Sequence, residues 1–162
     1  MTQASPRDAV VNRFSRHARS VGRARAVLRA QLAVWGIAGD AAEVAELLLS
    51  ELVTNAVRHA CAPQGREIRT LFSVNGGLLR LEVSDASDRQ PSPTVAGDGD
   101  EGGRGLSLVA ALSDDWGVMP REGVGKSVWA LVKLPARSVG GLVDDSRISA
   151  QVLGSRHRQQ RR

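Results

Sequence analysis

The order of secondary-structure signals along the chain predicts an α+β fold, a two-layer sandwich of helices over a sheet. Two helical segments come first, a hairpin-linked pair of strands follows, and one helix separates that pair from a second pair of strands. Rossmann folds alternate strand and helix strictly, so this order argues against one. The 162 residues are most simply one domain with tails, long enough to bury a core.

The first half of the chain is predicted to be helical. Apolar residues fall at helical spacing over residues 21–35, while most arginines of that segment lie off the apolar stripe. "GIAG" interrupts this helix, and Asp40 with Glu43 three residues later predicts the cap of a second, longer helix. That helix is expected to run to about residue 60. A weak signal within "NRFSRHARSV" indicates a short edge strand before both helices.

The second half carries the strand signals. Residues 66–74 and 78–85 are rich in strand formers, and "NGG" between them is a strong hairpin signal. Residues 86–103 are polar and rich in Gly, Pro and Asp, which predicts a long loop. "GLSLVAALSD" then predicts a short helix, and "DWGVMP" and "KSVWALVKLP" predict two more strands.

Composition and charge limit the classes of protein to which the chain can belong. No apolar run approaches the length of a membrane span, and the single cysteine, Cys61, excludes an internal disulfide framework. We therefore expect a cytoplasmic protein. The formal charge is +5, but five arginines against two aspartates from residue 138 onward account for most of it. We predict a flexible N-terminus at 1–12, a folded domain at 13–136 and a basic, disordered tail at 137–162.

The five letters "GVGKS", residues 123–127, look like the end of a phosphate-binding P-loop. A P-loop needs a glycine five positions before Gly125, and Pro120 stands there instead. The residues that follow are strand formers, whereas a P-loop opens a helix. The stretch is therefore interpreted as a hairpin turn.

Three polar residues recur at every fourth position of the long apolar helix: Glu51, Asn55 and His59. This spacing puts them on one stripe, where polar side chains need polar partners. An Asn oxygen suits Mg²⁺, and a neighbouring Glu can serve as a general base or hold a metal-bound water. The alternative is a solvent-facing edge with ordinary surface polar groups.

Two further segments have functional features. Asp85 follows Leu81 and Val83 at period two, so its carboxylate points to the covered face of the sheet, where an adenine amine is a suitable donor. "GGRGL" stands directly before a helix, where glycines and free N–H groups favour phosphate binding. Taken alone, Asp85 could start an ordinary turn and "GGRGL" could end a flexible loop.

The segments "ELVTNAVRHA", "SDAS", "EGGRGLSLV" and "GKSVWA" follow one another in an order that resembles the Bergerat-fold ATPases, which include gyrase, histidine kinases and mismatch-repair ATPases. More closely, the chain is similar to the anti-sigma-factor serine kinases and their short ATP-binding relatives. The resemblance covers roughly residues 14–135. It implies a mixed, mostly antiparallel sheet covered on one face by helices, with ATP and Mg²⁺ as cofactors.

The resemblance also implies roles for individual residues. Asn55 would ligate Mg²⁺, Glu51 would be the catalytic base, and Asp85 would recognise the adenine amino group. Residues 88–102 would form a lid over ATP. The remaining cofactor-binding positions are then His59, Ser87, Gly103, Arg104, Gly105, Leu106 and Ser127.

One departure from the family pattern leads to two functional hypotheses. The family usually has Asp-x-Gly-x-Gly where this chain has "DASDR", so Ser87 and Arg89 replace two glycines. The first hypothesis is a protein serine kinase that phosphorylates an anti-anti-sigma partner of the STAS type and holds a sigma factor in competition. The alternative is an ATP-sensing module that sequesters its partner without phosphorylating it.

The resemblance leaves room for a homodimer. A third hypothesis, nucleic-acid binding through the basic tail, has little support, because the folded part shows no strong basic bias and no aromatic stacking platform.

Overall fold

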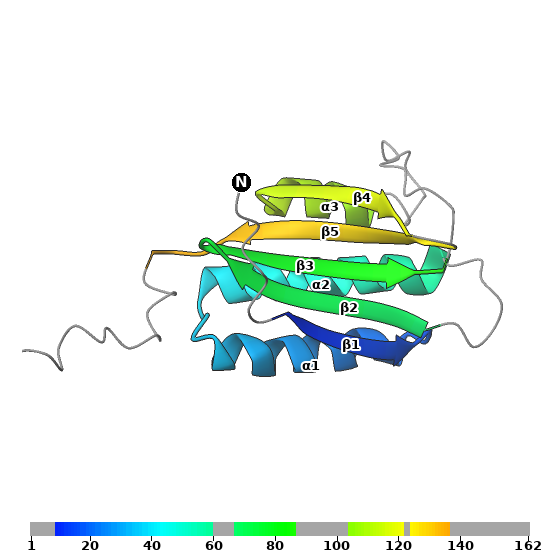
Figure 1. Ribbon diagram of the computed structural model, residues 1–162, viewed down its shortest axis with the longest axis horizontal. Coiled ribbons are helices and arrows are strands. Elements are labelled where there is room, and N and C mark those ends of the chain that lie inside the picture. Colours follow the sequence, from blue (N-terminus) through cyan, green and yellow to red (C-terminus); the bar gives the residue numbers. More distant parts are fainter. Residues whose placement is uncertain (1–8, 60–66, 87–103, 122–123, 137–162) are drawn as a thin grey trace, which may run out of the picture.

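The computed structural model describes residues 9–59, 67–86, 104–121 and 124–136 (Figure 1). Eight elements follow one another in these residues: β1 (Val10–Ser15), α1 (Arg19–Val34), α2 (Asp40–His59), β2 (Glu67–Asn75), β3 (Leu78–Asp85), α3 (Arg104–Leu112), β4 (Asp115–Pro120) and β5 (Lys126–Lys133).

The strands form one five-stranded sheet in the order β1-β2-β3-β5-β4, and all four pairings are antiparallel. The helices lie behind the sheet in Figure 1, so they cover one face, and none of the described helices covers the other, which is called the open face below. This arrangement confirms the predicted α+β two-layer sandwich. Among the described residues, no helix is long and apolar enough to cross a membrane.

The core lies between the sheet and the helices. Alternate residues of the central strands point inward and meet the apolar face of α2, which packs against β3, β5, α1 and α3. The largest buried side chains are Leu28, Leu32, Leu48, Leu49, Ile68, Phe72, Leu79 and Leu81. The long, strongly apolar helix of the sequence is thus the element around which the other helices are arranged.

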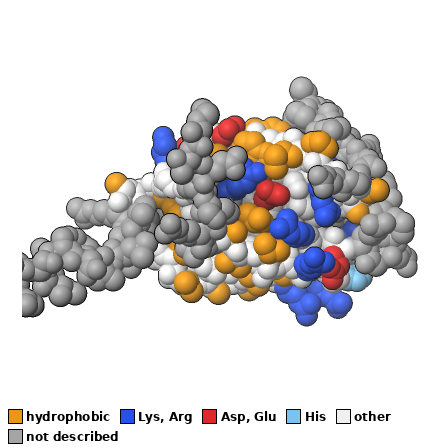
Figure 2. All heavy atoms as spheres, viewed as in Figure 1, with side chains coloured by type: hydrophobic (Ala, Val, Ile, Leu, Met, Phe, Trp, Pro, Cys, Tyr) orange, Lys and Arg blue, Asp and Glu red, His pale blue; other side chains and the backbone are white. Residues whose placement is uncertain are grey.

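The open face of the sheet mixes apolar and charged side chains (Figure 2). Arg80 donates two hydrogen bonds to Glu82 Oε2, and its guanidinium lies 4.8 Å from the centre of the Trp129 ring. Gly117 on β4 stands opposite Trp129, and a Cβ at Gly117 would come within 2.7 Å of that ring. The Trp129 ring therefore lies close to the backbone of Gly117 on the neighbouring strand.

Two elements begin at different residues than the sequence predicts. Helix α2 includes Asp40, and the carbonyl of Gly39 accepts the N–H of Glu43, so Gly39 rather than Asp40 stands at the cap. Strand β1 begins at Val10, inside the segment expected to be a loose N-terminus. It pairs with β2 along its whole length, which gives its backbone the hydrogen bonds of a sheet edge.

The hairpin signals in the sequence are confirmed. Gly76 and Gly77 both have positive φ, at 58° and 78°, and join β2 to β3 through a two-residue turn. Strands β4 and β5 also pair as a hairpin, and Arg121 N–H donates to the carbonyl of Gly125 across it. The described part of "GVGKS", residues 124–127, thus belongs to a hairpin and the start of a strand, as predicted, and does not open a helix as a P-loop does.

Candidate functional site

The candidate site lies at one end of the molecule, where four elements meet. Figure 1 shows that the C-terminal ends of α2 and β3 and the beginning of β5 lie toward the same end. Helix α3, which follows β3 in the chain, packs against α2. This arrangement brings together segments that are up to about half the chain apart in sequence.

Glu51 and Asn55 stand on the same stripe of α2 and are both partly buried. Leu52, Val53 and Ala56 beside them are buried in the core. The stripe therefore runs along the border of the core, where the two polar groups can reach a ligand while the helix keeps its apolar contacts.

The first turn of α3 lies directly on this stripe, at Gly105. A Cβ at Gly105 would be 2.7 Å from Glu51 Oε2, 3.3 Å from Asn55 Oδ1 and 3.4 Å from Asn55 Nδ2. Only a residue without a side chain lets α3 come this close. The carboxylate of Glu51 also stands beside the positive end of a helix, which stabilises negative charge there.

The amide of Asn55 has an unsatisfied nitrogen. Its Nδ2 atom is buried and makes no hydrogen bond within the described part of the chain. A buried polar atom without a partner costs about 1–3 kcal/mol of folding free energy. A bound ligand would supply the missing partner, and the amide oxygen would suit Mg²⁺.

Asp85 lies at the end of β3 and is 3% exposed. Its Oδ1 accepts a hydrogen bond from Lys126 Nζ at 3.2 Å, and Lys126 is 6% exposed. The two residues are directly opposite each other in the β3–β5 register. They lie on the same face as Val83 and Val128, which is the face covered by the helices.

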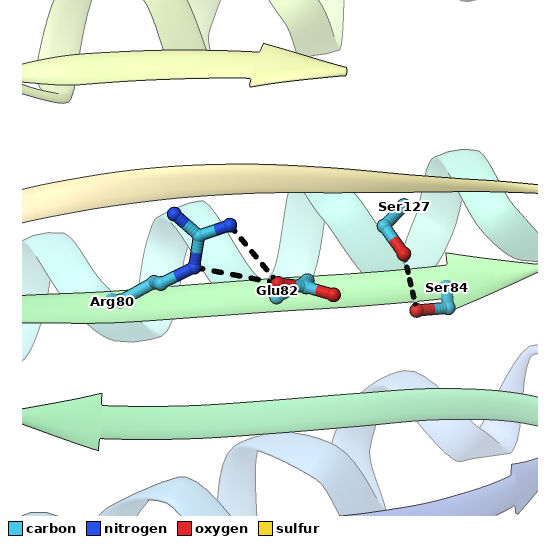
Figure 3. A network of polar contacts seen from close by, with 4 residues as sticks. All are labelled: Arg80, Glu82, Ser84 and Ser127. Carbon is cyan, nitrogen blue, oxygen red and sulfur yellow. Dashed lines mark hydrogen bonds and ion pairs between the residues drawn. The ribbon is translucent and has the colours of Figure 1, made fainter. Parts of the chain in front are cut away.

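Ser84 and Ser127 form the neighbouring pair in the same register. Their hydroxyl groups are 2.7 Å apart and share a hydrogen bond (Figure 3). Because strand residues alternate, this pair lies on the opposite face from Asp85 and Lys126, with Arg80 and Glu82. The structure therefore does not bring the Ser127 side chain together with Asp85.

Gly125 fixes the approach of β5 to the end of β3. Its φ is 110°, and a Cβ there would collide with the carbonyl oxygen of Asp85 and the Cα of Ala86. Since this conformation strongly disfavours residues with a side chain, Gly125 sets the position of the next residue, Lys126. The glycine of "GKS" therefore acts on the candidate site through the backbone.

The remaining predicted site residues divide into two groups. Gly105 and Leu106 are buried in the first turn of α3. Ser87 and Gly103 lie outside the described residues, as do the segment 88–102 and the side chains of His59 and Arg104. Among the described residues, no group of three or more His, Cys, Asp or Glu side chains could hold a metal ion.

Sequence reasoning missed the side chain of Lys126. It used period-two alternation to point Asp85 toward the covered face but did not apply the same rule to the last strand. Counting from the buried Val128 and Ala130 places Lys126 on the covered face and Ser127 on the open one. The contact between Lys126 and Asp85 depends on the register of β3 and β5, which cannot be derived from the sequence alone.

Comparison with known proteins identifies a family. A family model described as the histidine kinase-like ATPase domain matches residues 14–131, well over half of the chain. A search of the curated proteins found no match.

A solved structure with a TM-score above 0.5 shows the same fold. The chain is similar to the crystal structure of the RsbU and RsbW domains of Rv1364c from Mycobacterium tuberculosis, with a TM-score of 0.59 and 21% sequence identity. The alignment covers 80% of this chain and 33% of that one, so this chain spans about a third of the length of its structural neighbour. A histidine kinase domain from Erythrobacter litoralis EL346 matches at 23% identity and a TM-score of 0.46, over 85% of this chain and 68% of the other.

Proposed function

The chain belongs to the histidine kinase-like ATPase domain family, and from this premise we propose that it is a cytoplasmic, Mg²⁺-dependent ATP-binding regulator with protein serine kinase activity. The family assignment agrees with the resemblance to Bergerat-fold ATPases, while the kinase activity and the partner are our proposals. We propose an anti-anti-sigma protein of the STAS type as the phosphorylated partner and a sigma factor as the competing one.

The convergence of Glu51, Asn55 and Gly105 is the observation that carries this proposal. A carboxylate and an amide from one helix meet the first turn of a second helix, where N–H groups are available to phosphate oxygens. Phosphoryl transfer needs little covalent chemistry from the protein, because positioning and charge stabilisation supply most of the rate. This arrangement offers an acceptor for a proton, a metal ligand and an anion-binding helix end in direct contact.

Each residue then has a role in the proposed reaction. Asp85 accepts a hydrogen bond from the adenine amino group. Glu51 takes the proton of the partner's serine hydroxyl while that oxygen bonds to the γ-phosphorus, and ADP leaves with the electrons of the broken bond. Gly105 keeps the start of α3 close enough to Glu51 for the two to act on the same phosphate.

The residues present fit Mg²⁺ if the nucleotide supplies most of its ligands. Mg²⁺ is usually held by one or two protein oxygens together with phosphate oxygens and waters. Asn55 Oδ1 would be the protein ligand. When bound, Mg²⁺ neutralises part of the negative charge on the transferring phosphate.

Replacing Glu51 with glutamine tests its role as the base. We expect Glu51→Gln to bind ATP as the wild type does and to lose phosphoryl transfer, because the amide is isosteric but cannot accept the proton. Transfer would be measured by mass spectrometry of a STAS-type partner, and ATP binding by calorimetry. The control is Glu43→Gln, an exposed position in the first turn of α2. Undiminished transfer by Glu51→Gln would rule out this base.

The second candidate is an ATP-sensing module that binds its partner without phosphorylating it. "DASDR" favours it, since Ser87 and Arg89 stand where the family has the glycines of a lid hinge. It predicts partner binding that depends on ATP, with no phosphoserine in the partner after incubation. Mass spectrometry of the same partner decides between the two candidates.

A further inference from the structure

The buried ion pair between Asp85 and Lys126 contains a charge, that of Lys126, to which the proposed reaction gives no role. We propose that Lys126 is a specificity-determining residue that donates to the N1 atom of adenine while Asp85 accepts from the amino group on the adjacent carbon. The inference rests on the proposed function, because it assigns Lys126 a contact with the base in the same nucleotide site.

Fold stability alone gives a poor account of this pair. Taking two charges out of water costs several kcal/mol per ion, and well-packed apolar residues often stabilise as much or more. Both side chains are almost fully buried, and the two strands are already joined by a continuous antiparallel ladder from Leu78↔Lys133 to Asp85↔Lys126. The neighbouring Ser84–Ser127 hydrogen bond adds a second side-chain link on the other face. Strand pairing therefore does not require an ion pair here.

The position of the pair connects it with the candidate site. Asp85 is the last residue of β3 and Lys126 is the first of β5, so both stand at the end of the sheet toward which the C-terminal end of α2 lies (Figure 1). They lie on the helix side of the sheet, whereas Ser84 and Ser127 lie on the other. Gly125 holds the backbone of Lys126 against the backbone of Asp85 and Ala86.

The chemistry of the pair matches one purine edge. Adenine presents a donor at its amino group and an acceptor at N1, side by side. A carboxylate accepts only and an ammonium donates only, so the two groups together match both atoms. A carboxylate also offers about four acceptor positions and an ammonium three donors, which allows each group to keep the other as a partner. Guanine reverses the pattern, with an acceptor at O6 and a donor at N1, so in the same orientation it would meet two mismatched groups.

The decisive experiment changes the ligand and leaves the protein intact. The full chain is titrated by calorimetry, in the presence of Mg²⁺, with ATP, with 1-deaza-ATP, in which a C–H replaces N1, and with GTP. We expect 1-deaza-ATP to bind about 10-fold or more weakly than ATP, since it loses one charge-assisted hydrogen bond and puts a C–H group against the buried ammonium. GTP should bind more weakly still, because both groups are mismatched. Equal affinity for ATP and 1-deaza-ATP would overturn the inference.

Substitution of Lys126 supplies a second, independent comparison. Lys126→Met keeps most of the side-chain length without the donor, and Lys133→Met, an exposed lysine at the far end of the same strand, is the matched control. We expect the ratio of the affinities for ATP and for 1-deaza-ATP to fall to about one in Lys126→Met and to stay at the wild-type value in the control. Tighter ATP binding by Lys126→Met would overturn the inference, because Lys126 would then compete with the base for Asp85.

Failure of the inference and failure of the proposed function are distinguishable. A wild-type chain that binds no adenine nucleotide overturns both. A wild-type chain that binds ATP and 1-deaza-ATP equally keeps the proposed nucleotide site and removes only the role of Lys126.

Discussion

At the scale of one residue, Asn55 combines an unfavourable buried group with a proposed role in binding. Its Nδ2 atom is buried without a hydrogen-bond partner in the described part of the chain, on a helix whose neighbouring side chains form the core. Removing such a group relieves an unfavourable desolvation, whereas removing a well-paired one does not. Stability and nucleotide affinity should therefore respond differently to the same substitution.

We predict that Asn55→Ala leaves the free energy of unfolding within about 1 kcal/mol of the wild type, since the lost group has no partner at Nδ2. Its affinity for Mg²⁺ and ATP should fall by about 10-fold or more. Urea unfolding measures the first quantity and calorimetric titration the second. Thr54→Ala, on the same helix, is the control for changes in the helix itself. Wild-type affinity in Asn55→Ala would contradict the role of the amide.

The candidate residues differ in how far the sequence could predict them. Glu51 and Asn55 are predictable because helical spacing is a local property of one segment. The inward direction of Asp85 follows from two apolar neighbours in the same strand. The partner of Asp85 was missed, because Lys126 is 41 positions away and only the register of two strands brings them together.

At the scale of elements, the local signals gave the hairpins and the long helices correctly. "NGG" specifies a turn with two positive φ angles, and the apolar stripe specifies α2, so neither needs information from elsewhere in the chain. The ends of β1 were harder to predict, because it is a six-residue edge strand whose partner β2 lies more than 50 residues later. Its pairing is a tertiary property, and the sequence near Val10 contains only a weak trace of it.

Two glycine substitutions should have opposite effects on stability. Gly125→Ala is expected to lower the free energy of unfolding by at least about 2 kcal/mol, because φ at 110° is strained for alanine and its Cβ would meet the Asp85 backbone. Gly22→Ala should raise it by roughly 0.5–1 kcal/mol, since Gly22 is an exposed position inside α1 with open space around it. Urea unfolding of both variants measures the sign of each change in the free energy of unfolding. Equal changes would contradict the strain expected at position 125 before β5.

At the scale of the whole molecule, the sheet order decides where the site forms. β5 lies between β3 and β4, which puts the last of the described strands beside the strand that carries Asp85. The fold class was predictable from the order of helices and strands. The strand order was not, because the same elements can be arranged in several sheets with similar local patterns.

A chain that begins at the predicted domain boundary, residue 13, should be less stable than one that begins four residues earlier. A chain of residues 9–136 keeps all of β1, whereas a chain of residues 13–136 loses the pairs of Val10, Val11 and Asn12 with β2. We expect the longer chain to match the stability of the full protein and the shorter one to lose roughly 1–2 kcal/mol. Urea unfolding of the three chains measures this. A large loss in residues 9–136 would show that the segments outside it contribute to the fold.

The Arg80–Trp129 contact has a consequence for spectroscopy. The chain has three tryptophans and no tyrosine, so its intrinsic fluorescence comes from indole rings alone. Trp35 and Trp116 pack against the core, while Trp129 lies on the open face of the sheet under a guanidinium. A molecule that covers this face would displace Arg80 or water from the Trp129 ring and change its emission. The wild-type protein thus contains its own optical reporter for partners that dock on the face opposite to the helices.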